Sequence, residues 1–114
     1  MTKKIFLIKS ADLQPGCTRK VETEGGDLAV FNLGGKFYAT SNMCTHATAS
    51  LADGEIVGDD CIACPVHFGE FHIPTGQALT FPCTVDLRTY KVIEEGEDIY
   101  ADLDAESEEA ASAI

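Results

Sequence analysis

The sequence predicts an all-β protein with an antiparallel sandwich or barrel as its base and one loop-rich subdomain. Short apolar or alternating runs are separated by turns that contain Gly or Pro, which is typical of strands joined by tight connections. No stretch before residue 104 keeps a helical period of 3.6 residues over three turns. Cysteine, histidine, glycine and proline are concentrated between residues 42 and 83. The length of 114 residues suits a single domain.

The first part of the chain is expected to form most of the base. Gln14-Pro15-Gly16 and Glu24-Gly25-Gly26-Asp27 predict turns between the first strands. Gly34-Gly35 predicts a tight hairpin, because a primed two-residue turn needs positive φ at both central positions. The strands that these signals predict span residues 5–9, 18–21, 28–33 and 36–41.

Residues 42–83 are expected to form the loop-rich subdomain. Its short strands are predicted at residues 56–57, 61–63 and 70–73, and a last hairpin at residues 87–93 and 99–103. Residues 1–103 therefore make up one predicted domain. Residues 104–114 are rich in Ala, Ser and Glu, with little to bury. They are expected to form an acidic, flexible tail, and a short amphipathic helix is the alternative.

The chain is strongly acidic. Nineteen acidic residues against eight basic ones give a formal net charge of -11. Such a chain repels nucleic acid and anionic membranes and is attracted to basic protein surfaces, although the charge could serve solubility alone. The N-terminal apolar run is too short for a secretory signal, and no window has the ~20 apolar residues of a membrane span. Five cysteines, an odd number, favour reduced thiols in the cytoplasm.

Two short motifs carry the chemistry: Cys44-Thr-His46 and Cys64-Pro-Val-His67. Two thiolates and two imidazoles suit either a tetrahedral zinc site or an iron–sulfur cluster. Structural zinc sites usually pair like ligands, whereas here each motif supplies one Cys and one His. That arrangement fits a [2Fe–2S] cluster in which one iron binds both thiolates and the other binds both imidazoles. A zinc-binding module with the same four ligands is the alternative.

The sequence around these motifs resembles the Rieske ferredoxins that serve bacterial aromatic-ring-hydroxylating dioxygenases. The resemblance is carried by Phe37-Tyr-Ala-Thr-Ser-Asn-Met-Cys-Thr-His46, Leu51-Ala-Asp-Gly54, Cys64-Pro-Val-His-Phe-Gly-Glu-Phe71, Thr75-Gly76 and Thr89-Tyr-Lys-Val92. It implies the Rieske fold and a monomeric one-electron carrier. Such a carrier passes electrons from a flavin-containing NAD(P)H-dependent reductase to a terminal oxygenase and is not catalytic alone.

Departures from the high-potential Rieske proteins predict a low reduction potential. Their two extra cysteines correspond here to Ala49 and Val66, and the hydroxyl that usually follows the second motif is absent, because His67 is followed by Phe68 and Gly69. Fewer hydrogen bonds to sulfur stabilise the reduced cluster less. The potential is therefore expected near the bottom of the Rieske range of about −150 to +300 mV. Phe68 stands where this family commonly has a small residue.

The other cysteines and His72 are expected to have structural roles. Phe81-Pro82-Cys83 is predicted to cover the cluster, as a proline loop does in Rieske proteins, with an ordinary turn as the alternative. His72 and Cys61 are expected to be strand residues, and Cys17 and Cys83 unreactive thiols.

Two further functions compete with the ferredoxin. The small Rieske-like subunit of an assimilatory nitrite reductase shares the fold but often lacks the full ligand set, which is complete here. A self-contained Rieske oxygenase needs a second iron site, usually two histidines and a carboxylate. After the cluster motifs only His72 is left, so the chain is not expected to be an oxygenase by itself.

Overall fold

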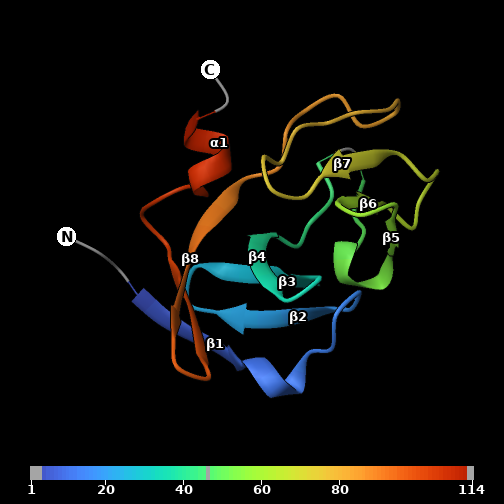
Figure 1. Ribbon diagram of the computed structural model, residues 1–114. Coiled ribbons are helices and arrows are strands. Elements are labelled where there is room, and N and C mark those ends of the chain that lie inside the picture. Colours follow the sequence, from blue (N-terminus) through green and yellow to red (C-terminus); the bar gives the residue numbers. More distant parts are fainter. Residues whose placement is uncertain (1–3, 46, 113–114) are drawn as a thin grey trace.

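The computed structural model describes residues 4–45 and 47–112. A six-stranded antiparallel sheet and a three-stranded sheet make up the fold. Figure 1 shows the smaller sheet beside the curved larger one. The predicted all-β class with a separate loop-rich part is confirmed. The strands are β1 Lys4–Lys9, β2 Thr18–Thr23, β3 Gly26–Leu33, β4 Lys36–Ser41, β5 Glu55–Val57, β6 Cys61–Ala63, β7 Glu70–His72, β8 Thr89–Glu95 and β9 Asp98–Asp102.

The helical elements are short. Two 3-10 turns, η1 (Ser10–Asp12) and η2 (Leu51–Asp53), and one α-helix, α1 (Glu108–Ser112), complete the described chain. Within residues 4–45 and 47–112, no helix has the length and apolar character needed to cross a membrane.

The base is the larger sheet, with strand order β1-β9-β8-β4-β3-β2. The predicted glycine hairpin joins β3 to β4, where Leu33 pairs with Lys36 and the φ angles of Gly34 and Gly35 are 64° and 102°. The last hairpin is confirmed with a shifted start, since β8 begins at Thr89. Leu87 donates its backbone N–H to Gly76 instead (2.8 Å) and so belongs to the connection from the smaller sheet.

Strand β3 connects the two parts of the molecule because it is buried on both faces. Leu28 and Val30 pack into the core inside the base, whereas Ala29 and Phe31 pack into a second core beneath the small sheet. All four are less than 2% exposed. Neighbouring side chains on a strand point to opposite faces, so a continuous apolar run is what a strand covered on both sides requires.

The C-terminal segment is more structured than the predicted tail. Ser107 is buried, its hydroxyl donates to the carbonyl of Pro74 (2.6 Å), and its N–H donates to Thr89 Oγ1 (3.0 Å). Its Oγ also accepts from the N–H of Ala110 (3.1 Å), which caps α1. The short helix, the alternative in the sequence prediction, is therefore the observed structure of residues 108–112. The flexibility of the tail and the domain boundary at residue 103 stay predictions.

Candidate metal centre

The first cysteine motif lies in a loop that is closed by backbone pairing and held by Asn42. Cys44 donates its N–H to the carbonyl of Ala49 (3.0 Å), and Met43 bridges to Ser50. Asn42 is 4% exposed, and its side chain donates to Ser50 Oγ (2.8 Å) and accepts from the N–H of Ala52 (3.0 Å). Sequence reasoning missed this role of Asn42, although a polar residue just before the motif was a possible signal.

The second motif lies in a tight loop between β6 and β7. The N–H of Cys64 donates to the carbonyl of Gly69 (2.8 Å), which closes the loop. His67 and Phe68 have φ angles of 67° and 59°, in the left-handed region that residues other than glycine rarely adopt. Such backbone strain is found mainly where a functional site requires it.

The structure brings Cys44 and Cys64 together from these two loops. Both are buried in one core, where the two thiols are neighbours. Burial raises the pKa of the Cys64 thiol, and the neighbouring Cys44 raises it further. The backbone N–H of Val66 donates to the Cys64 sulfur and lowers the pKa in part. Two buried thiols side by side ionise at low cost only when a cation compensates their charge. The pair therefore fits a metal centre that supplies positive charge.

The two histidines are placed differently. His46 lies outside the described residues, and His67 is exposed on the tight second loop. Among the residues whose positions are described, no three His, Cys, Asp or Glu side chains gather closely enough for one metal ion. A two-iron cluster is compatible with this spread, because its thiolates and imidazoles bind different irons.

A third loop, which contains Phe81-Pro82-Cys83, packs against the second. A methyl group at Gly69 would lie 2.5 Å from Cys83 Sγ and 3.2 Å from Pro82 Cδ, so Gly69 permits this close approach. The first loop contacts the third as well, since Thr45 Oγ1 donates to the carbonyl of Val85 (2.6 Å). The three loops form one packed unit.

The Cys83 thiol belongs to the same buried group as the Cys44 and Cys64 thiols. Burial and the neighbouring Cys44 raise the pKa of Cys83 to about 12, with a smaller contribution from Cys64. The covering of the cluster by residues 81–83 stays a prediction. Cys83 was predicted to be an unreactive thiol, and that it shares a core with Cys44 and Cys64 was not predicted.

The remaining candidates lie away from these thiols. His72 is a β7 residue, as predicted, and its ring contacts Thr75 Oγ1 (2.7 Å) and Asp60 Oδ2 (3.0 Å). Cys61 is a β6 residue, also as predicted, and Cys17 is exposed.

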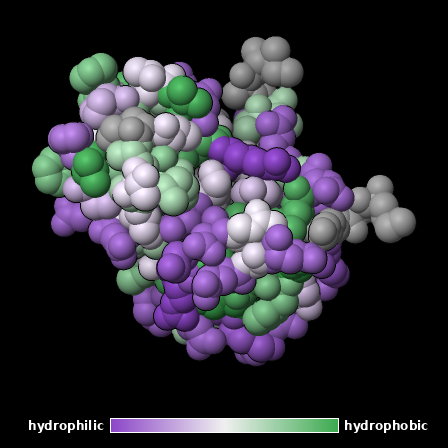
Figure 2. Space-filling view, turned by 180° about the vertical axis from the view of Figure 1, so that it is seen from behind, coloured by the Kyte–Doolittle hydropathy of each residue, from purple (hydrophilic) through white to green (hydrophobic). Residues whose placement is uncertain are grey.

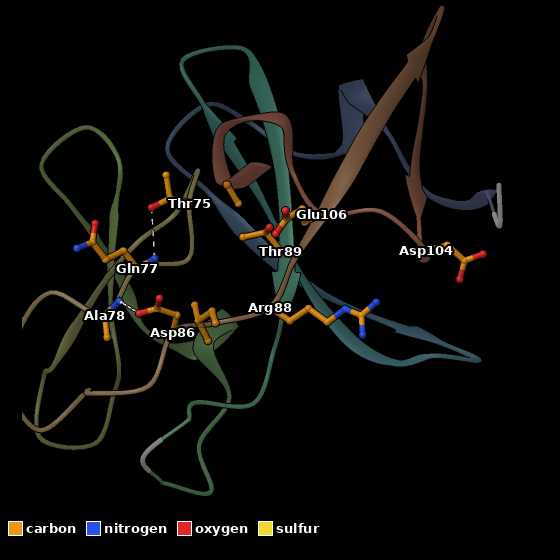
Figure 3. Close-up of a pocket in the computed structure, with 10 residues that line it drawn as sticks. Thr75, Gln77, Ala78, Asp86, Arg88, Thr89, Asp104 and Glu106 are labelled. Carbon is orange, nitrogen blue, oxygen red and sulfur yellow. Dashed lines mark hydrogen bonds between the residues drawn. The ribbon is translucent and has the colours of Figure 1, made fainter. Parts of the chain in front are cut away.

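A polar cleft of about 790 Å³ lies between the chain before β8 and the C-terminal segment, and Figure 3 shows its lining. Asp86, Asp104, Glu106 and Arg88 line it, and the Asp86 carboxylate accepts from the N–H of Ala78 (2.9 Å). None of the described motif residues takes part in this lining. The cleft is therefore separate from the candidate metal centre.

An all-β base that carries facing loops with buried thiols, each near a histidine in the chain, defines a small metal-cluster protein. The chain belongs to the Rieske [2Fe–2S] domain family, whose match covers residues 3–91. Its cofactor is a Rieske-type [2Fe–2S] cluster, and the resemblance noted in the sequence is confirmed.

Within this family, the chain is similar to ferredoxins. The chain is 39% identical over 100 residues to the 3-phenylpropionate/cinnamic acid dioxygenase ferredoxin subunit of Escherichia coli K12. The aligned residues cover 88% of this chain and 93% of the E. coli subunit. The ferredoxin of Sphingomonas yanoikuyae B1 superposes with a TM-score of 0.82 at 38% identity and covers 88% of this chain and 98% of that one. These relatives are electron-transfer subunits, and this chain is likewise a ferredoxin and not a catalytic component.

A ferredoxin solved in complex with the oxygenase of carbazole 1,9a-dioxygenase is similar too, with a TM-score of 0.81, 38% identity and coverage of 87% and 92%. Small subunits of nitrite reductases are also similar in structure, but at 23% identity they show the shared fold alone.

Proposed function

We propose that this ferredoxin carries single electrons from a flavin-containing NAD(P)H-dependent reductase to the terminal oxygenase of an aromatic-ring-hydroxylating system. Cys44, His46, Cys64 and His67 hold the cluster in this proposal. The observation that supports it most is the pairing of two buried thiols by loops that each contain one of the histidines. The oxygenase in complex with the similar carbazole ferredoxin supports the choice of partner.

In the proposed site, the buried thiolates of Cys44 and Cys64 would hold one iron, and His46 and His67 would hold the other. The bound cluster supplies one-electron redox chemistry. The N–H of Val66 donates to the Cys64 sulfur and helps to hold its negative charge. Leu51, Phe71 and Leu87 pack in the same core and exclude water from the sulfurs.

The exposed side carries the features of a docking face. Met43, Phe68, Phe81 and Val85 are exposed by 56%, 73%, 87% and 60%, and all four lie in the three packed loops. Figure 2 shows hydrophobic residues among polar ones at the end of the molecule that carries the small sheet and these loops. We define Met43, Phe68, Phe81 and Val85 as the apolar rim. Exposed apolar side chains around a redox site suit a small, transient contact below about 1,200 Å².

The net charge of -11 favours binding to partner proteins with basic surfaces. Long-range attraction speeds the encounter between partners, and salt screens it. Electron transfer from the reductase is therefore expected to slow as ionic strength rises. The protein acts as a cytoplasmic monomer in this proposal.

The ligand set is tested by comparing His67→Ala with His72→Ala. The His67 variant is expected to lose the Rieske electron-paramagnetic signal of the reduced protein, whereas the His72 variant keeps it, because His72 binds Asp60 and Thr75. Iron and acid-labile sulfide are measured in parallel. An unchanged signal in the His67 variant, or a wild-type protein that holds zinc and no sulfide, would refute the proposal.

The docking face is tested by Phe81→Ser, with Phe6→Ser on β1 as the matched control. Phe6 is also exposed, by 50%, but it belongs to the base. Loss of an apolar anchor at a contact lowers the rate of electron transfer to the oxygenase about tenfold. Equal rates in the two variants would contradict the role of the apolar rim.

A further inference from the structure

Cys83 is a buried thiol that the proposed ligand set does not use. It is 3% exposed and packs in one core with Cys44 and Cys64. Its N–H donates to the carbonyl of Thr80 (2.9 Å), which fixes the loop on which it lies. The thiol neighbours Cys44 and Cys64 in that core.

We propose that the Cys83 S–H donates a hydrogen bond to the sulfur of Cys44 and thereby raises the reduction potential of the cluster. This inference rests on the proposed role of Cys44 as an iron ligand. Cys83 is a tuning residue here and binds no iron itself. A thiol offers one weak donor, and a buried site without competing water strengthens it.

The second loop has no side-chain hydroxyl that could act as such a donor. The residues after His67 are Phe68 and Gly69, which have no side-chain hydroxyl, so this loop provides no side-chain O–H of the kind found in high-potential Rieske proteins. A donor at sulfur favours the reduced cluster, because that form carries more negative charge. Cys83 would therefore supply from the third loop part of what the second loop lacks.

Gly69 positions the thiol. A methyl group at this position would lie 2.5 Å from Cys83 Sγ, so any larger residue would push the thiol or its loop away. Gly69 also closes the second loop through its carbonyl, which accepts from the N–H of Cys64 (2.8 Å). Gly69 therefore closes the loop that contains Cys64 and also leaves space for the Cys83 thiol.

The test measures the reduction potential of Cys83→Ala and Cys83→Ser, with Cys61→Ala as the control. Cys61 is a half-buried β6 thiol beside Asp60. The alanine variant is expected to lower the equilibrium constant for one-electron reduction about three- to tenfold, where tenfold equals about 59 mV. The serine variant should restore or exceed the wild-type value, because a hydroxyl donates more strongly, and the control should not change.

Cluster content separates this inference from the proposed function. Variants with full iron, sulfide and an unchanged Rieske signal, but with the wild-type potential, would overturn the tuning role alone. Equal potentials for Cys83→Ala and Cys83→Ser would overturn it as well, because packing would then explain the shift. A changed signal in Cys83→Ala would make Cys83 a ligand and refute the inference.

Gly69→Ala provides a second route should the Cys83 variants fail to load. It is expected to lower the potential by displacing the thiol. Where Cys83→Ala does load, adding Gly69→Ala to it should have no further effect. A Gly69→Ala protein with the wild-type potential would contradict the inference.

Discussion

The base and the three-loop unit are built in different ways. The base has strands of five to eight residues joined in an antiparallel ladder, and its hydrophobic core includes Leu28, Val30 and Tyr90. The small sheet has three strands of three residues each, and its core includes three cysteines. His67 and Phe68 adopt left-handed backbone conformations in the second loop.

The two regions are stabilised by different interactions. Backbone hydrogen bonds between strands and the burial of apolar side chains stabilise the base without a bound cofactor. The three-loop unit has short ladders and a strained turn, and left-handed residues other than glycine cost on the order of 1–3 kcal/mol each. Binding of the cluster compensates this cost, since ligand binding to the folded state stabilises it.

Loss of the cluster is the strongest test of this contrast. Cys64→Ala removes a proposed ligand, and we expect hydrogen exchange in residues 42–83 to accelerate by about 1,000-fold, or about 4 kcal/mol. Exchange in β3 and β4 should change little near their shared hairpin. Cys17→Ala, at an exposed thiol, is the control. Uniform acceleration across both regions would show that they unfold together.

Truncation of matched core residues sharpens the contrast. Ile99 in the base and Ile62 in the small sheet are both 0% exposed. Each change to Ala should cost about 3 kcal/mol of unfolding free energy. Only Ile62→Ala is expected to speed the loss of cluster absorbance, because Ile62 shares its core with the ligand thiols. Equal rates of cluster loss would break the distinction.

The anchor of the C-terminal segment gives a smaller effect. Ser107→Ala removes the bond to the carbonyl of Pro74 and the cap of α1, and it should cost about 1 kcal/mol in chemical unfolding. Thr23→Ala, which loses an exposed hydrogen bond to the carbonyl of Gly26, is the control. A larger loss in the control would contradict the anchoring role.

The smallest effect is expected from Glu109. Burial raises the pKa of this carboxyl, but bonds from Lys36 and Tyr38 outweigh it and leave the pKa below its ordinary value. A lowered folded pKa means that the contact stabilises the docked helix at neutral pH and is lost as pH falls through the folded value. The amide resonance of Ala111 should therefore shift on acidification, and Glu109→Gln should remove that dependence. A shift that persists in the variant would exclude Glu109 as its cause.

Sequence reasoning predicted the base well because local signals coincide with its structure. The alternation, the double glycine at Gly34-Gly35 and the apolar run of β3 are each readable in a short window. It also selected the cysteine and histidine motifs, because unlike ligands in each pair suit a two-iron cluster. The bracing of the first loop by Asn42 and the burial of Ser107 were missed, since both depend on partners distant in the chain.

The amino-acid sequence was sufficient to predict the fold class, the family and the residues proposed as iron ligands. These follow from residue types and spacing, which act over a few positions along the chain. Three features became visible only in the folded chain: Cys83 lies near Cys44, Gly69 leaves space for its thiol, and the apolar rim comes from three loops. The physical reason is that such contacts arise when distant segments pack together, and no local pattern encodes which side chains then become neighbours.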